Sequence, residues 1–207
     1  EIGTLYSEWL ANVNERYYSG DHIPKAFEYF AEEALKIGQK DLAKRAFGMA
    51  AEAYGAVAVS AHEARDVLIA EEEDGGIMDH ERFGELVERE ARALEGQADV
   101  LVKLGDFDSA LAKLAEARNY FIARRFHAEL SIDGTRRTAI NEGNSKRVID
   151  LFSKEVAILY HSDNYHAALD ANGRAISYLR ELIDLLVLEG APPEKTMVYE
   201  RTIIELN

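Results

Sequence analysis

The strongest concentration of chemically useful side chains is a basic stretch between residues 118 and 147. It holds seven basic and three acidic residues, in a chain whose formal net charge is −14. Arginine pairs with carboxylates through two parallel hydrogen bonds and stacks on aromatic rings, so such a stretch is useful at an interface. We therefore predict a surface for an acidic protein or peptide partner, made of Arg118, Tyr120, Arg124, Arg125, Arg136, Arg137, Lys146 and Arg147.

The same stretch has a second interpretation. Phe121 could belong to the core, with the arginines balancing acidic neighbours within one molecule. The residues alone leave both interpretations open. A binding role predicts that an acidic partner or a second copy of the chain contacts the arginines, and that salt weakens the contact.

Histidines and acids occur together at three places, and each is a candidate metal site. His161, Asp163 and His166 offer three candidate ligands within six residues, but the histidines flank a predicted turn. Residues 62–63 and 79–81 also combine His with acids, yet adjacent helical residues point to different faces. We predict no metal site and no cofactor.

Enzymatic motifs are scarce in this sequence. Arg16 and His22 have a spacing similar to that of the Arg-x(4–6)-His pair of HEPN ribonucleases, but Ser19, Gly20 and Asp21 interrupt the helix that this pair requires. The sequence has no glycine-rich phosphate loop, no His-Glu-x-x-His and no Gly-x-Ser-x-Gly. We therefore predict a non-enzymatic protein. The alternative is a helical-bundle enzyme or small-ligand-binding protein with a buried polar site.

Composition limits the remaining classes of protein. Of 207 residues, 47% are hydrophobic, which is enough for a substantial core. The absence of cysteine excludes disulfides and fits a reducing compartment, so we expect a cytoplasmic protein. No apolar run is long enough to span a membrane, and the negative charge argues against nucleic-acid binding. The chain begins with Glu1 rather than Met, so we expect a processed or truncated product.

Apolar residues recur at helical spacing over almost the whole chain. We predict one domain over residues 1–207, all-α, with about seven or eight helices and no strand. Residues 71–76 form the clearest linker, because they combine like charges with paired glycines. Residues 131–143 are predicted to be a loop or a short broken helix. The helices are expected near residues 4–18, 24–37, 41–72, 80–104, 107–129, 145–159, 165–189 and 197–206.

Three short segments share one pattern, in which a turn residue is followed by Ala five and twelve residues later. The turn residues are Gly38, Gly105 and Asp163, and the alanines are Ala43 and Ala50, Ala110 and Ala117, and Ala168 and Ala175. This pattern resembles the hinge between the paired helices of tetratricopeptide (TPR) repeats. The resemblance implies an antiparallel helical array that works by holding a protein partner, a peptide, or another copy of itself.

The pattern departs from the TPR family in three ways. The hinges are 67 and 58 residues apart rather than one TPR length, and no unit has the proline that closes the second helix in that family. Asn172 also stands where the third unit should have a bulky residue. We therefore expect a TPR-like array with elongated helices, similar in style to the soluble NSF attachment proteins. The alternative is an ordinary helical bundle.

Overall fold

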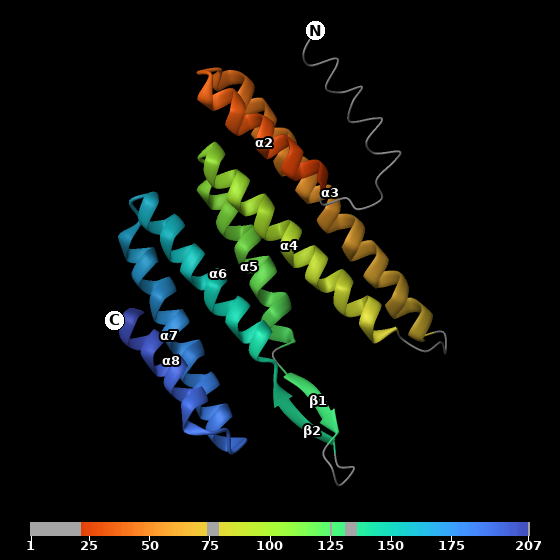
Figure 1. The fold of residues 1–207 in the computed structure, drawn as a ribbon, viewed down its shortest axis with the longest axis vertical. Helices are drawn as coiled ribbons and strands as arrows, with labels where there is room; N and C mark the ends of the chain where they lie inside the picture. The colour runs from red at the N-terminus through yellow and green to blue at the C-terminus, as the bar shows by residue number, and fades with distance from the viewer. Residues whose placement is uncertain (1–21, 74–78, 125, 131–135, 207) are drawn as a thin grey trace. The chain divides into compact units, whose positions relative to one another are not determined.

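The computed structural model describes residues 22–73, 79–124, 126–130 and 136–206. Seven helices and one two-stranded hairpin occur within these residues, as Figure 1 shows. The chain forms two compact units, Glu1–Lys113 and Leu114–Asn207. The prediction of an all-α helical array of seven or eight helices is confirmed. The prediction of one domain stays a prediction.

The described part of unit 1 contains three helices and the first part of a fourth. Helices α2 (His22–Lys36) and α3 (Lys40–Glu73) pack together, and α3 packs along α4 (His80–Leu104). The 34 residues of α3 confirm the predicted elongated helix. Asp79 caps α4, because its carboxylate accepts a hydrogen bond from the Arg82 amide at 3.0 Å.

Small residues allow α3 and α4 to pack closely. The ring of Tyr54 lies against Gly96, where a Cβ atom would come within 2.5 Å of the Tyr54 Cε1 atom. One residue further along α4, the Gln97 side-chain amide donates to the Ala51 carbonyl at 3.1 Å. The glycine is therefore needed for room at this helix crossing and not for an unusual backbone conformation.

The three predicted hinges share one backbone geometry. Gly38, Gly105 and Asp163 have φ values of 78°, 80° and 58°, in the left-handed region that lets a helix end in a tight turn. In each turn, the amide after the hinge residue donates to a carbonyl five residues back. These bonds join Gln39 to Ala34 at 2.8 Å, Asp106 to Leu101 at 2.9 Å, and Asn164 to Leu159 at 2.9 Å.

The first alanine of each pattern lies in the first turn of the helix that follows the hinge, and it is buried. Each alanine at the fifth position donates its amide to the carbonyl of the residue after the hinge, at 3.0 or 3.1 Å. The exposed fractions are 1% for Ala43, 0% for Ala110 and 6% for Ala168. The second set, Ala50, Ala117 and Ala175, is also buried. All six alanines of the repeated pattern are therefore buried.

Unit 2 begins within α5 (Phe107–Ala123) and continues through α6 (Glu142–His161), α7 (Tyr165–Leu188) and α8 (Pro193–Leu206). Helix α7 packs against both α6 and α8. Asn172 uses its polar side chain at the position where the repeat pattern expects a bulky one. Its Nδ2 atom donates to the Leu206 carbonyl at 2.6 Å, which ties α7 to the last turn of α8.

The prediction that the chain has no strand is wrong, because the structure contains a β-hairpin. Strands β1 (Phe126–Leu130) and β2 (Arg136–Ile140) pair antiparallel, with Phe126 opposite Ile140, where we predicted the end of a helix and a loop or broken helix. The hydrophobic cluster that contains Ile140 explains why β2 is held in place. Ile140 is 6% exposed and packs with Leu182 and Leu186 of α7.

The predicted first helix, near residues 4–18, lies outside the described residues. The part of the predicted 71–76 linker that follows Glu73 also lies outside them. Within the described residues, no helix is both long enough and apolar enough to cross a membrane.

Candidate functional site

A buried ion pair organises the interior of unit 2. Arg118 of α5 donates a hydrogen bond to Glu155 of α6, and their side chains are only 11% and 12% exposed. The Arg118 guanidinium also lies over the ring of Phe152, 4.1 Å from its centroid. Phe152 in turn packs against Tyr178 of α7, with ring centroids 6.2 Å apart. Arg118 is therefore held between an acidic and an aromatic neighbour inside the unit.

A second arginine reaches the same carboxylate from α7. Arg174 donates to the other oxygen of Glu155, so one carboxylate bridges two guanidinium groups. Together the three side chains connect α5, α6 and α7. One carboxylate can neutralise only one of the two arginines. The Arg174 side chain is 54% exposed, which brings the remaining positive charge to the surface of α7.

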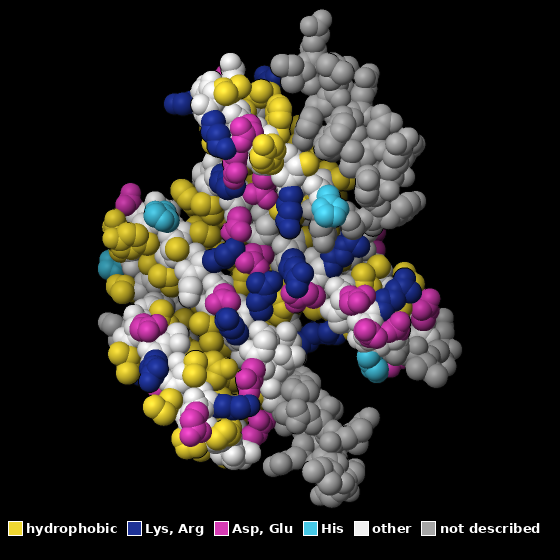
Figure 2. All heavy atoms as spheres, in the orientation of Figure 1, with side chains coloured by type: hydrophobic (Ala, Val, Ile, Leu, Met, Phe, Trp, Pro, Cys, Tyr) yellow, Lys and Arg dark blue, Asp and Glu magenta, His cyan; other side chains and the backbone are white. Residues whose placement is uncertain are grey.

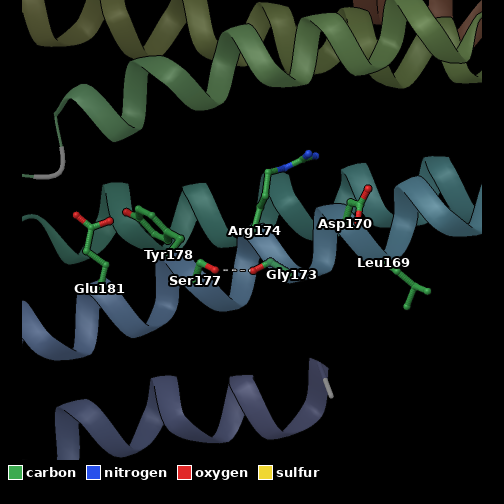
Figure 3. A pocket seen from close by; sticks show the side chains of 7 residues that line it. All are labelled: Leu169, Asp170, Gly173, Arg174, Ser177, Tyr178 and Glu181. Carbon is green, nitrogen blue, oxygen red and sulfur yellow. Dashed lines mark hydrogen bonds between the residues drawn. The ribbon is translucent and has the colours of Figure 1, made fainter.

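Arg174 lies at the middle of an open groove with a volume of about 740 Å³. Figure 3 shows the lining side chains at successive turns of α7, with Arg174 between Asp170 and Glu181. Because these residues recur every three or four positions, the groove follows the helix axis. The lining residues are Leu169, Asp170, Gly173, Arg174, Ser177, Tyr178 and Glu181.

The groove offers a hydroxyl group, an apolar side chain and charges of both signs. The Ser177 hydroxyl donates to the Gly173 carbonyl at 2.9 Å, as a serine within a helix commonly does. Leu169 is 68% exposed at one end and supplies an apolar contact. The carboxylates of Asp170 and Glu181 and the guanidinium of Arg174 supply charges of both signs. This arrangement suits recognition of a polar, elongated surface.

The structure separates the predicted binding residues into different environments. Arg118 belongs to the buried ion pair, which matches the second interpretation of the basic stretch. Arg147 lies 5.7 Å from the centroid of the Phe121 ring, and Phe121 is buried. Tyr120 is half-buried, whereas Lys146 is exposed.

Arg124 is also half-buried, and its carbonyl accepts a hydrogen bond from the Asn144 side chain at 2.7 Å. Arg125 lies outside the described residues, and the side chains of Arg136 and Arg137 are likewise not described. On the face drawn in Figure 2, Lys and Arg side chains lie among Asp and Glu side chains. The predicted role of the basic stretch in partner binding stays a prediction, and the Arg118 side chain is only 11% exposed.

The histidine set at the third hinge has other contacts. The Tyr165 hydroxyl donates to Asp163 at 2.8 Å, and this hydrogen bond raises the pKa of Tyr165. The ring of Tyr160 lies edge-on to His161, with centroids 6.5 Å apart. His22 is the first residue of α2, whereas Arg16 lies outside the described residues. Within the described part of the chain, no three His, Asp or Glu side chains are grouped so that they could hold a metal ion.

Unit 1 has a charged cluster of the opposite composition, in which one basic side chain lies between two acidic ones. Lys103 of α4 donates to Glu28 at 3.1 Å and to Glu32 at 2.8 Å, both on α2, and its ammonium lies 5.1 Å from the centroid of the Phe47 ring. Partial burial alone would lower the pKa of Lys103, but the hydrogen bonds to Glu32 and Glu28 outweigh it and raise that pKa. The same hydrogen bond lowers the pKa of Glu32.

A second polar cluster in unit 1 joins α3 to α4. Glu90 is 3% exposed and accepts a hydrogen bond from Arg65 at 2.8 Å, while His62 lies 3.0 Å from its other oxygen. His62 and Arg65 are one turn apart on α3, so one face of that helix holds the buried carboxylate. The structure therefore pairs His62 with Glu90 of α4, which the adjacent His62–Glu63 pair in the sequence did not indicate.

Sequence reasoning did not single out the groove residues Asp170, Arg174, Tyr178 and Glu181. A usable signal was present, because Asp170, Arg174 and Glu181 recur on one helical face as acid, base and acid. The sequence could not indicate that Glu155 pairs with Arg174, since the two residues are 19 positions apart and a turn lies between them.

Comparisons with known proteins give little to add to this geometry. No protein-family model matches the chain, and no curated protein matches it. Among solved structures, the chain is similar to the de novo designed helical repeat protein DHR64. The two are 15% identical with a TM-score of 0.44, over 90% of this chain and 92% of that one.

Proposed function

We propose that this protein is a non-enzymatic interaction module that holds a segment of a protein partner along α7. The observation that carries the proposal is the shape of the groove. Its lining runs from Leu169 to Glu181 on a single helix, a length of about 18 Å at the rise of an α-helix. A groove of this kind accommodates a helix or an extended peptide, which recognition grooves commonly bind.

The chemistry of the groove supports the same proposal. Small-molecule sites are usually enclosed and mainly apolar, so that they cover most of the ligand. Here the groove is open, and three charged side chains, Asp170, Arg174 and Glu181, line it. The buried Arg118–Glu155 pair beneath it fixes the position of Arg174, which makes the binding surface rigid before a partner arrives.

A library of displayed helical peptides, selected on the purified protein, tests the proposal. Gly173→Trp is the blocking variant, because Gly173 is exposed and a Cβ atom there meets nothing within 4 Å. The bulky ring fills the groove without disturbing the core. Arg180→Trp is the matched control, since Arg180 is exposed on the same helix outside the groove.

We expect selected peptides to bind the wild type and the Arg180→Trp variant equally, and to lose at least about tenfold in affinity for Gly173→Trp, which corresponds to about 1.4 kcal/mol. Selection of no peptide, or of peptides that tolerate Gly173→Trp, would contradict the proposal. Saturable turnover of a small molecule that Gly173→Trp abolishes would instead favour the alternative of a small-ligand or enzymatic site.

A further inference from the structure

Helix α8 has apolar side chains on the face that it turns away from α7. Its inner face packs on α7, where Thr196 is buried and Tyr199 contacts the hydrophobic cluster that contains Ile140. Three apolar side chains of the outer face are exposed to water, namely Met197 (47%), Val198 (61%) and Ile204 (73%). A surface helix normally turns polar residues to this side, and apolar side chains grouped on one exposed face mark interaction sites.

Two charged residues share this outer face. Glu194 and Arg201 are exposed and seven residues apart, which is close to two helical turns, so they lie on one line along the helix. At about 100° per residue, Met197 and Ile204 lie on one side of that line and Val198 lies on the other. Neither Glu194 nor Arg201 forms an ion pair with another described residue. The face thus combines one acid, one base and the apolar side chains beside them.

The positions of the two charges make this face complementary to itself. In an antiparallel pair of α8 helices centred between Met197 and Val198, Glu194 and Arg201 each lie about 5 Å along the axis from the centre. Glu194 of each copy therefore faces Arg201 of the other, and a two-fold axis forms both ion pairs at once. The two Val198 side chains meet on one side of the ion pairs, and the two Met197 side chains meet on the other.

Other arrangements of two α8 helices bring like charges together. A parallel pair related by a two-fold axis sets Arg201 against Arg201 and Glu194 against Glu194. An antiparallel pair centred near Arg201 also sets the two arginines together, and one centred between residues 199 and 200 sets Glu194 against Glu205. Like charges in contact disfavour such pairings. Among these arrangements, the antiparallel one centred between Met197 and Val198 is the one that pairs opposite charges.

We propose that the outer face of α8 is a self-association surface, on which a second copy of this chain packs antiparallel. Two reciprocal Glu194–Arg201 ion pairs fix its register, and Met197 and Val198 form its apolar centre. This surface is separate from the α7 groove, because none of the residues that line the groove belongs to α8. The inference goes beyond the proposed function and does not depend on it.

Apolar side chains also extend the contact at both ends of the helix pair. In this register, Ile204 of one copy comes level with the residues just before α8 in the other copy. Val187 and Leu188 lie close to that turn, in the last turn of α7, and are 62% and 82% exposed. Figure 2 shows hydrophobic, acidic and basic side chains together in the part of the molecule that Figure 1 labels α7 and α8.

Sedimentation velocity of the 207-residue chain tests the inference, at concentrations up to about 1 mM, where even a weak dimer is populated. We expect the wild type to dimerise. Glu194→Arg and Arg201→Glu each set two pairs of like charges together, so each variant should dimerise at least about tenfold more weakly. An equimolar mixture of the two variants should regain the dimer, because one chain then has two bases and the other two acids at these positions. The double variant Glu194→Arg/Arg201→Glu should regain it alone.

Arg45 and Glu52 of α3 provide the matched control. Both are exposed, and they are also seven residues apart. Arg45→Glu and Glu52→Arg change the net charge by the same amounts as the α8 variants and should leave the dimer unchanged. Thermal melting by circular dichroism confirms that each variant is folded, and recovery of the dimer in the mixture gives the same information independently.

A wild-type chain that stays monomeric over the whole concentration range overturns the inference and leaves the face to a different protein. A dimer that both single variants retain overturns it as well, and so does a mixture of the variants that fails to dimerise. The proposed function is tested separately, in the peptide selection, because Gly173→Trp and Arg180→Trp do not alter α8.

Discussion

Each unit ties three helices together with charged side chains beside a core aromatic ring, but the two ties have opposite composition. In unit 1, Lys103 lies between Glu28 and Glu32, and its side chain is 36% exposed. In unit 2, Glu155 lies between Arg118 and Arg174 and is 12% exposed. The charged cluster of unit 1 has one more acid than base and is partly exposed to water. The charged cluster of unit 2 has one more base than acid, and its Arg118–Glu155 pair is buried.

The difference shows how burial decides what a charged contact contributes. An exposed pair gains little, because water and salt screen it. A buried pair is expensive to break, since removal of one partner leaves the other charge without compensation in the interior. We therefore expect the unit 2 tie to be the more sensitive to mutation, although the unit 1 tie has as many hydrogen bonds.

The largest effect is expected for Glu155→Gln. This change leaves Arg118 buried without a carboxylate, and the free energy of unfolding should fall by about 3–5 kcal/mol. Urea denaturation measures the loss. The double variant Arg118→Met/Glu155→Leu is the control, because it removes both charges and should be as stable as the wild type or more stable. Equal losses for the single and double variants would show that packing, and not an uncompensated charge, explains the effect.

An intermediate effect is expected at the hinges, which occur in both units. Ala110 is fully buried, so Ala110→Leu should overpack its helix contact and lower the free energy of unfolding by about 1–3 kcal/mol. Ala168→Leu makes the same test at the third hinge. Ala112 is exposed on the same helix as Ala110, and Ala112→Leu should change stability by less than about 0.5 kcal/mol. An unchanged melting temperature for Ala110→Leu would contradict close helix packing at Ala110.

The smallest effect is expected at the unit 1 tie and depends on pH. Lys103 lowers the pKa of Glu32 below its usual value of 4.5, so the stabilisation is complete above that pH and is lost as pH falls through the lowered pKa. Lys103→Met should lower the free energy of unfolding at pH 7 by at most about 1 kcal/mol. The difference in the free energy of unfolding between the wild type and Lys103→Met should become smaller at low pH.

Urea denaturation at several pH values between 7 and 3 measures that gap. Lys44→Met, at an exposed position of α3, is the control and should show no such narrowing. A gap for Lys103→Met that stays constant across this range would mean that its contact with Phe47, and not the Glu32 pair, accounts for the loss.

The hinges could be predicted from the sequence because their causes are local. A glycine or aspartate in the left-handed region ends a helix, and a polar residue directly after it starts the next one. Asp106 and Asn164 do so here, by accepting hydrogen bonds from the amides of Ser109 and Ala167. The buried alanines followed from the same short pattern.

The hairpin and the groove could not be predicted in this way. Strand β2 reads as a polar segment with little periodicity, and what holds its last residue, Ile140, is contact with Leu182 and Leu186 more than forty residues later. The basic stretch likewise gave no sign of which arginine would be buried.

The sequence by itself thus determined the helices, their turns and the small residues at the turns, because these depend on backbone conformation and side-chain size over a few neighbouring residues. Only the tertiary structure decided the roles of the charges. Arg118 and Arg174 have the same chemistry, yet Arg118 became an interior residue and Arg174 a surface one. The reason is the position of Glu155, which is 37 residues from Arg118 and 19 residues from Arg174 in the sequence. The packing of α5, α6 and α7 buries the side of this carboxylate that contacts Arg118 and leaves the side that contacts Arg174 close to solvent.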